Sequence, residues 1–441
     1  MPNSLVIKGF SKLSRSEKLS WLQKQADLSA SALQLLERHL HPDPELQEVY
    51  GGISENNITN YFLPMGLAPN FLVNGNLVTV PMVIEESSVV AAASHAAKFW
   101  TMHGGFHAEV KGTVKTGQVH FTWSGSEEDL QKLFRQNREK LLDSVRSLTG
   151  RMEQRGGGIE EIGIRRGSVS LQDYYQLFVE VHTADAMGAN FINSVLEVLA
   201  GQFPAMVNDA ELNGELEVVM SILSNYTPEC LVACHLEGKT EIFGSMDPRM
   251  SGEEFARRFK LAVDIACEDT HRAVTHNKGI FNGMDAVILA TGNDFRAVEA
   301  CGHAFASREG RYGSLSRVDL SGTQFRFTLE VPLAVGTVGG LTGSHPMAAV
   351  ALEILGDPSA EQLMQVVAAA GLANNFSAVR SLITTGIQAG HMKLHLGNIL
   401  RQLKANRDET GLVTEHFRER PVTHTEVSAF LANLRDQNQR Q

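Results

Sequence analysis

The chain has 441 residues, of which 43% are hydrophobic and 20% are charged, a composition typical of a folded globular protein. This length exceeds what one hydrophobic core normally supports, so we expect two or three domains. The net charge of −11 argues against a nucleic-acid-binding protein, which would carry a basic surface, but it leaves room for an anionic small-molecule substrate.

Four cysteines in a chain of this length are too few for a disulfide framework. Cys230 and Cys234 precede His235, but no second ligand pair stands at zinc-finger spacing, so we expect no metal site. The chain shows no basic-then-apolar leader, and no apolar run approaches the roughly 20 residues needed to cross a bilayer. We therefore expect a cytoplasmic protein.

The N-terminal part of the chain predicts helices, a hairpin and a further helix. Leucines spaced among charged residues indicate amphipathic helices over 15–40. Asn74-Gly75 lies between two apolar runs and favours a type I′ turn between two strands. Ser88 is expected to cap the helix of small residues that follows it. Glu86 therefore lies between a strand and a helix, a common position for a catalytic group.

Residues 112–225 have a pattern of their own, which predicts an inserted domain. Strands are predicted over 118–123, 159–165, 174–183 and 216–224, and helices over 126–149 and 187–201. The order β-α-β-β-α-β is that of the split βαβ, or ferredoxin-like, unit.

The remainder of the chain is predicted to be mostly helical. Helices are predicted over 252–274, 296–307, 345–355, 359–371 and 375–386, with a charged helical tail over 388–441. The apolar run Ala286–Ala290 is predicted to be a short buried strand. Phe325–Leu333 is predicted to be a second strand, and it leads into the glycine-rich stretch 336–343, which suits close approach of a ligand.

The segment Thr183–Asn190 follows a predicted strand and opens a predicted helix. Its small residues let a ligand approach the backbone, and a helix N-terminus attracts anions. The segment therefore suggests a dinucleotide-binding turn, although the chain contains no G-x-G-x-x-G pattern. A helix cap at Asp185 with tight helix packing explains the same residues, and both interpretations stay open.

Two further segments carry residue types suited to catalysis. Lys278 precedes the predicted strand and Asp294 follows it, so the two can fold into a buried charge pair that stabilises an oxyanion. A purely structural salt bridge is the alternative. His391 and His395 stand at i and i+4, which places both on one helix face, but methionine occupies the glutamate position of the zinc-protease pattern H-E-x-x-H.

Six segments resemble, in the same order, the motifs of the class II (bacterial) 3-hydroxy-3-methylglutaryl-CoA (HMG-CoA) reductases. They are Glu85–Ser94, Asp185–Asn190, Thr275–Gly279, Ala290–Asp294, Gly371–Phe376 and Gly390–His395. The resemblance runs from about residue 8 to residue 435. It implies a reversible, four-electron reduction of HMG-CoA to mevalonate and free CoA, through a hemithioacetal and mevaldehyde, in the mevalonate pathway of isoprenoid biosynthesis.

The resemblance also implies roles for individual residues. Glu86 matches the catalytic glutamate, a proton donor, and Lys278 matches the lysine that polarises the thioester carbonyl and stabilises the oxyanion. Asp294 matches the aspartate that links these two, and His391 matches the histidine that protonates the departing CoA thiolate. Substrate-pocket positions are matched by Ser88, Arg272, Asn282, Asn374, Asn375 and His395. Cofactor positions are matched by Asp185, Met187, Gly188 and Asn190.

The implied fold class is α+β with an inserted domain. A large, mostly helical CoA-substrate domain comprises 1–111 and 226–386, and the ferredoxin-like NAD(P)-binding domain is inserted at 112–225. A small helical flap, 387–441, carries His391 as a lid over the site. The family also implies a homodimer, or a higher oligomer of dimers, whose active site is completed across the interface.

Three positions depart from the family pattern. Thr59 and Ser87 replace a glycine and a proline, and Asn374 replaces a glutamine on the substrate side. These changes leave open a CoA-ester-binding paralogue with altered substrate or little activity, and the histidine spacing alone leaves open a histidine-based metalloenzyme. For the cofactor we favour NADPH over NADH. Thr149 stands near the aspartate that some members carry for a free ribose 2′-hydroxyl, and the nearby Arg151 suits a 2′-phosphate.

Overall fold

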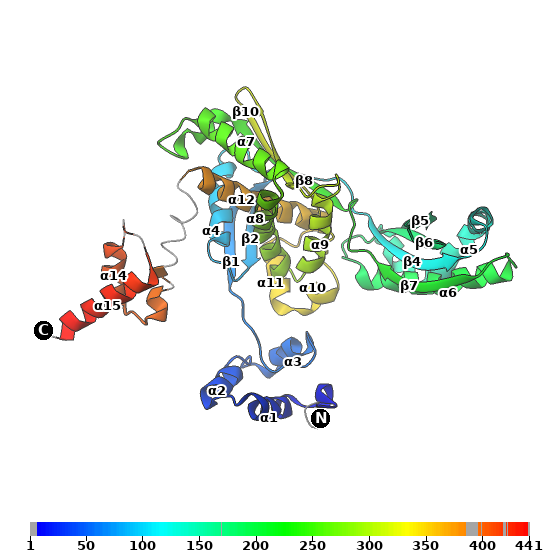
Figure 1. The fold of residues 1–441 in the computed structure, drawn as a ribbon, viewed down its shortest axis with the longest axis horizontal. Helices are drawn as coiled ribbons and strands as arrows, with labels where there is room; N and C mark the ends of the chain where they lie inside the picture. The colour runs from blue at the N-terminus through cyan, green and yellow to red at the C-terminus, as the bar shows by residue number, and fades with distance from the viewer. Residues whose placement is uncertain are drawn as a thin grey trace.

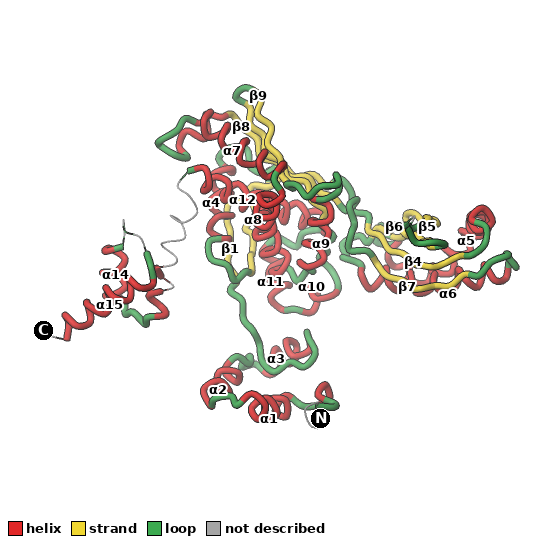
Figure 2. The backbone as a smooth tube through the Cα atoms, viewed as in Figure 1, coloured by secondary structure: helices red, strands yellow, loops and turns green. Residues whose placement is uncertain are grey.

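The computed structural model describes residues 7–168, 170–384, 396–397, 399–417, 420 and 422–439. Figure 1 shows a central body of helices and strands, from which one α/β unit projects to the side. The N-terminal helices lie below the body in this view, and the C-terminal helices lie opposite the projecting unit. Figure 2 shows strands in the body and the projecting unit, whereas both terminal units are helical. The mixture of helix and sheet expected from the sequence is confirmed.

The chain begins with an N-terminal arm, the name used below for residues 10–52. It contains a 3-10 turn, η1 (Phe10–Lys12), and the helices α1 (Arg15–Ala26), α2 (Ala30–Arg38) and α3 (Pro44–Gly52). Each α-helix begins after a residue whose side chain accepts a hydrogen bond from the first turn, namely Ser14, Ser29 and Asp43. The helices predicted over 15–40 are confirmed.

A hairpin and a helix follow the arm. The strands β1 (Met65–Val73) and β2 (Asn76–Val83) pair in antiparallel fashion, and the turn residues Asn74 and Gly75 have φ angles of 48° and 84°. Positive φ at both central residues is what a type I′ turn requires, so this prediction is confirmed. Helix α4 (Val89–Thr101) begins where expected, but the predicted serine cap is wrong. Ser88 has a φ of 78°, outside the extended region that a cap needs, and its side chain makes no capping hydrogen bond.

The projecting unit has the predicted split βαβ order. Its elements are β4 (Lys115–Trp123), α5 (Glu127–Glu153), β5 (Gly158–Arg166), β6 (Tyr174–His182), α6 (Ala189–Asp209) and β7 (Leu216–Leu223). The strands form one antiparallel sheet in the order β5-β6-β4-β7. Alternate residues of β4 and β6, such as Val119 and Leu177, are fully buried beneath α5 and α6.

The body holds a second antiparallel sheet and the helices that pack on it. Its strands are β3 (His107–Val110), β8 (Leu231–Lys239), β9 (Ser316–Ser321) and β10 (Gln324–Pro332), in the order β3-β8-β10-β9. Its later helices are η2 (Thr240–Ser245), α7 (Gly252–Glu268), α8 (Thr270–Ala290), α9 (Phe295–Ala306), α10 (Gly340–Ser344), α11 (Pro346–Ile354) and α12 (Ala360–Ile383). The aromatic rings of Trp100, Phe243, Phe259, Phe325 and Phe376 meet at its centre, all at most 1% exposed.

Three predictions for the helices and strands of the body are wrong. The strand expected over 286–290 is the last part of α8, because a short apolar run fits a buried helix as well as a buried strand and the packing against α12 decides. The helix expected over 252–274 is interrupted at Asp269, whose extended backbone and carboxylate cap the start of α8. The helices expected over 359–371 and 375–386 are one continuous helix, α12.

Helix α12 is the one described helix that is long and apolar enough to cross a membrane by length and composition. It lies inside the body, where 72% of its most apolar window is buried. The apolar composition of α12 therefore reflects its place in a protein core.

Helices α8 and α12 approach closely because glycines lie where they cross. A Cβ atom on Gly283 of α8 would lie 2.4 Å from the backbone oxygen of Ala370. A Cβ atom on Gly371 of α12 would lie 2.6 Å from Cγ of Met284. Since no larger side chain fits, the glycines set how these two helices are placed against each other.

The C-terminal unit contains α14 (Arg407–His416) and α15 (His424–Gln439), which fall in the predicted helical tail. It has a small apolar core of its own, which includes Leu396, Val413 and Val427.

We expect Gly283→Ala to lower the free energy of unfolding by about 1–3 kcal/mol, because the new methyl group overlaps a backbone carbonyl that cannot move alone. Urea denaturation followed by circular dichroism measures this change. Gly201→Ala is the matched control, since Gly201 lies inside α6 with nothing within 4 Å of an added Cβ. That variant should be neutral or more stable by about 0.5–1 kcal/mol. Equal stabilities for the two variants would contradict the close crossing.

Candidate active site

A pocket of about 460 Å³, here called the α8 pocket, lies between α8, α12 and the loop that joins β2 to α4. This volume is in the range of small-molecule sites. Its polar lining residues include Glu86, Ser87, Ser88, His95, Arg272, Lys278, Asn282, Asn374, Asn375 and Arg380. The side chains on α8 and α12 face one another here because the glycine crossing holds the two helices together.

An ion pair joins the two sides of the α8 pocket. Lys278 Nζ donates to Oε2 of Glu86 at 2.6 Å, although the residues are far apart in the chain. The two side chains are 59% and 39% exposed, and pairs as exposed as this contribute little to stability. The pair therefore points to a chemical role, because it presents an ammonium and a carboxyl group together to any ligand in the pocket.

Two guanidinium groups line the same pocket without an acidic partner. Within the described part of the chain, no carboxylate lies within ion-pair distance of Arg272 or Arg380. Arg380 donates instead to the ring of His95, at 3.2 Å, and burial lowers the pKa of this histidine below its usual value. Burial also lowers the pKa of both guanidinium groups. Partly buried cations without a counter-charge favour an anionic ligand.

A buried network behind the pocket holds the amide of Asn375 in place. Ser316 Oγ donates to Asn375 Oδ1 at 2.9 Å, and Nε2 of His276 lies 2.6 Å from the same hydroxyl. Burial lowers the pKa of His276 to about 3, so its ring is neutral. The neighbouring Asn374 donates to the backbone oxygen of Val89 at 3.2 Å and thereby ties α12 to α4.

A second cleft, of about 520 Å³, lies where the projecting unit meets the body and is here called the turn cleft. Three segments line it: 186–191 at the start of α6, 292–296 at the start of α9, and 336–342. Each of these segments was singled out in the sequence, and the fold brings them to one wall.

Backbone contacts hold the three segments together. Thr337 N donates to the backbone oxygen of Asp185 at 2.8 Å, and the side-chain amide of Asn293 exchanges two hydrogen bonds with the backbone of Gly336. A Cβ atom on Gly336 would lie 2.3 Å from the backbone nitrogen of Met187. Only glycine therefore allows this approach.

The start of α6 has unsatisfied donors that face the turn cleft. Gly188 is the N-cap residue, with a φ of 90°, and no side chain caps the first turn. The alternative of an Asp185 cap for α6 is thus wrong, because the Asp185 carboxylate accepts from the backbone nitrogen of Ala360, in the first turn of α12, at 2.8 Å. Free N–H groups at the start of a long helix suit an anion such as a diphosphate.

The chain matches the family model described as hydroxymethylglutaryl-coenzyme A reductase over residues 14–396. It belongs to this family. A 3-hydroxy-3-methylglutaryl-coenzyme A reductase of Archaeoglobus fulgidus is 36% identical over 412 residues, which cover 93% of this chain and 90% of that relative. A probable reductase of Borreliella burgdorferi is 35% identical over 352 residues, 79% of this chain and 78% of that relative.

Solved structures of the family share the fold. The class II HMG-CoA reductase of Streptococcus pneumoniae, bound to NADPH in open conformations, matches with a TM-score of 0.71 and 37% identity. That match covers 86% of this chain and 99% of the other. A second structure of the Streptococcus pneumoniae reductase matches with a TM-score of 0.72 and 35% identity, and covers 97% of this chain and 99% of the other.

The site residues predicted from the sequence divide between the two cavities. The α8 pocket is lined by Glu86, Ser88, Arg272, Lys278, Asn282, Asn374 and Asn375. The turn cleft is lined by Met187, Gly188, Asn190 and Asp294. His391 and His395 lie outside the described residues, so their predicted roles stay predictions.

The charge pair expected between Lys278 and Asp294 does not form within the chain. Asp294 instead caps α9 and pairs with Arg296 at 3.1 Å. The error followed from the predicted strand over 286–290, which would have folded the chain back. The helix that replaces it rises roughly 18 Å between Lys278 and Ala290, at about 1.5 Å per residue, and carries the two charges apart.

Four other positions lie away from where the sequence suggested. The Asp185 carboxylate binds the backbone nitrogen of Ala360 at the start of α12, and Asp185 does not line the turn cleft. Arg151 is exposed in the last turn of α5 and also does not line it, while Thr149 is buried and donates to Glu153 at 2.6 Å. Thr59 donates to the backbone of α2 at 2.6 Å and is not part of the α8 pocket, so it does not alter the edge of that pocket.

Sequence reasoning missed His95, Arg380 and Asn293. A signal for Arg380 exists, since it is the one basic residue of the largely buried helix α12 and a buried cation needs a reason. Asn293 lies inside the motif segment Ala290–Asp294, which was its signal, whereas His95 carries none, because its partner Arg380 is distant in the chain. Among the described residues no group of three or more histidine, cysteine or acidic side chains is placed to hold a metal ion.

We expect Gly336→Ala to weaken NADPH binding at least about tenfold, because the new methyl group pushes the turn at Met187 away from the body. Fluorescence titration with NADPH measures the affinity. Gly343→Ala, in the same glycine-rich stretch, has nothing within 4 Å of the added Cβ and should bind NADPH as the unmodified protein does. Unchanged affinity in a stably folded Gly336→Ala variant would refute the role given to this contact.

Proposed function

We propose that this chain reduces HMG-CoA to mevalonate and free CoA, in two hydride steps through a hemithioacetal and mevaldehyde. The observation that carries the proposal is the 2.6 Å contact between Lys278 Nζ and Glu86 Oε2. It lies in a pocket that also contains the unpaired guanidinium groups of Arg272 and Arg380. The acyl carboxylate and the phosphates of HMG-CoA are anions of the kind that such cations bind.

The proposed roles follow from where charge develops. Each reduction step builds negative charge on a former carbonyl oxygen, and a fixed ammonium stabilises that charge in the transition state. We assign this to Lys278 and proton transfer to Glu86, which lies within hydrogen-bond distance of the ammonium. Ser88, Asn282 and Asn375 are assigned to the acyl group. His391 is assigned, on the resemblance alone, to protonate the departing CoA thiolate, and His395, on the same ground, to the substrate pocket.

The turn cleft is proposed to hold the cofactor, with Met187, Gly188 and Asn190 against it. Two features support a cofactor in this cleft: the uncapped start of α6, and Gly336, which lets Met187 approach the body. A reduced nicotinamide supplies hydride when bound there. The NADPH-bound reductase of Streptococcus pneumoniae supports NADPH over NADH. Arg151 is exposed and, among the described residues, has no ion-pair partner, so it is free to meet a 2′-phosphate.

We propose further that the active site is shared by two chains of a homodimer. The turn cleft contains Asp294, whereas the proton donor and the ammonium lie in the α8 pocket, and the length of α8 separates them within one chain. A partner chain can supply Asp294 and the cofactor to each α8 pocket. Exposed apolar residues between the N-terminal arm and the hairpin, such as Tyr61 at 91%, also suit burial against a partner. We also propose a cytoplasmic location, since α12, the one described helix apolar enough to cross a membrane, is buried in the core.

The purified protein should oxidise about two NADPH molecules for each CoA thiol released from HMG-CoA, because the thioester accepts hydride twice. Absorbance of the nicotinamide and a thiol reagent measure the two quantities, with NADH in a parallel series. Lys278→Met should lower kcat by at least about a hundredfold, because it removes the oxyanion's cation. Lys260→Met, on the adjacent helix α7 outside both cavities, is the control.

A flat absorbance trace with both cofactors would refute the reductase proposal. Tight binding of HMG-CoA without turnover would instead favour a CoA-ester-binding paralogue. Ser87 and Asn374, which depart from the family pattern and line the pocket, are the reason to consider this alternative. A faster reaction with NADH than with NADPH would contradict the cofactor choice.

Mixing two inactive variants tests the shared site. Lys278→Ala and Asp294→Ala chains, each inactive alone, should regain roughly a quarter of normal activity when co-expressed, since half of randomly paired dimers contain one intact site. Steady-state assays of the mixture measure the recovery. Sites made within single chains would give no recovery, because every mixed dimer would then carry two damaged sites.

A further inference from the structure

A lysine lies buried beneath the turn that borders the turn cleft. Lys115 is the first residue of β4, and its side chain shares the inward face of the sheet with Val119 and Phe121. Only 4% of the residue is exposed. A cation in an apolar layer is costly, so its position needs a reason.

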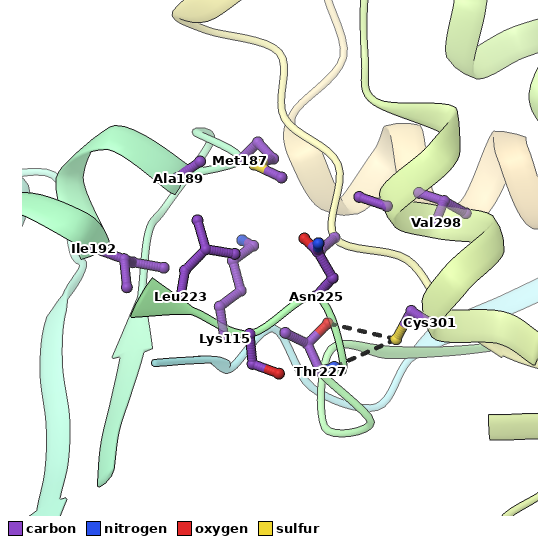
Figure 3. Close-up of a pocket in the computed structure, with 12 residues that line it drawn as sticks. Lys115, Met187, Ala189, Ile192, Leu223, Asn225, Thr227, Val298 and Cys301 are labelled. Atoms are coloured by element: carbon purple, nitrogen blue, oxygen red, sulfur yellow. Dashed lines mark hydrogen bonds between the residues drawn. The ribbon is translucent and has the colours of Figure 1, made fainter. Parts of the chain in front are cut away.

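The Lys115 ammonium holds the turn from inside. Nζ donates to Thr183 Oγ1 at 2.6 Å and to the backbone oxygen of Ala186 at 3.3 Å. The Thr183 hydroxyl donates to the same backbone oxygen at 2.6 Å. These hydrogen bonds link the two ends of the turn and stabilise the strained backbone between them, where Ala184 has a φ of 46°. Figure 3 shows the Lys115 side chain at the junction of the projecting unit and the body, near Met187, Leu223 and Asn225.

The positive charge of Lys115 has no counter-charge in the described part of the chain. No described carboxylate lies within ion-pair distance, and the carboxylate of Asp185 is turned to the start of α12. The nearby thiols of Cys230 and Cys301 are neutral, because burial raises the pKa of both. Burial lowers the pKa of Lys115, as expected for an unpaired buried ammonium. An anion in the turn cleft would provide the missing charge.

We propose that Lys115 is a positioning residue for the cofactor, which fixes the Thr183–Ala186 turn and favours the dinucleotide's diphosphate through its charge. Lys115 belongs to none of the six motif segments. The inference rests on the proposed function in one respect, since it needs a dinucleotide in the turn cleft. It adds a specific source for the affinity, namely a cation behind the turn that complements the free N–H groups of α6.

Two variants separate the charge from the hydrogen bonds. Lys115→Met keeps the apolar stem and removes both, whereas Lys115→Gln removes the charge and keeps a side-chain donor that is one bond shorter. In both variants the Kd and KM for NADPH should rise about tenfold, as for loss of an interaction with a charged group. The KM for HMG-CoA and kcat should stay within about twofold, because the α8 pocket is untouched. Lys111→Met, an exposed lysine that pairs with Glu109, is the matched control.

Each outcome decides the proposal. Unchanged NADPH affinity in either folded variant would overturn it, and so would an equal rise in the KM values for NADPH and HMG-CoA, which is the mark of a general structural defect. NADPH binding is titrated without HMG-CoA, so it does not depend on turnover. Lys115-dependent binding without turnover would refute the reductase proposal and support this one. Absence of NADPH binding by the unmodified protein would overturn both.

Discussion

The close crossing of α8 and α12 is the constraint on which the rest of the site depends. Gly283 and Gly371 let the two helices touch, so that Lys278 and Asn282 on one helix face Asn374 and Asn375 on the other across a single pocket. The same packing turns the apolar run at the end of α8 into helix. It thereby carries Asp294 and the turn cleft well away from Lys278. A packing requirement between backbones thus leads to the proposal that two chains share one active site.

Within the described structure, both cavities have cations without carboxylate partners beside them, although the chain has a net charge of −11. Arg272 and Arg380 in the α8 pocket, and Lys115 behind the turn cleft, lack carboxylate partners among the described residues. Each is partly or fully withdrawn from water, and burial lowers the pKa of each. Burying an unpaired cation in this way costs free energy when no ligand is bound, and an anionic ligand beside the cation offsets that cost. They indicate where the anionic parts of a CoA ester and of a dinucleotide belong.

How far the sequence predicts this molecule depends on whether the signal is local. The strand and helix order of residues 112–225 and the Asn74-Gly75 turn were predictable, because alternation and turn chemistry act over a few residues. The end of α8 was not, since Ala286–Ala290 has no period that separates helix from strand and α12 decides its state. The false Lys278–Asp294 pair followed from that error. The contact of His95 with Arg380 joins residues on α4 and α12, which are distant in the chain, so no local sequence pattern predicts it.

The shared active site is tested most directly by a crystal structure of the protein with HMG-CoA and the oxidised cofactor bound together. The proposal predicts a dimer in which the nicotinamide and Asp294 of one chain meet Lys278 and Glu86 of its partner. A nicotinamide bound beside Lys278 of its own chain would contradict the proposal. Full activity of a monomeric protein in solution would contradict it as well.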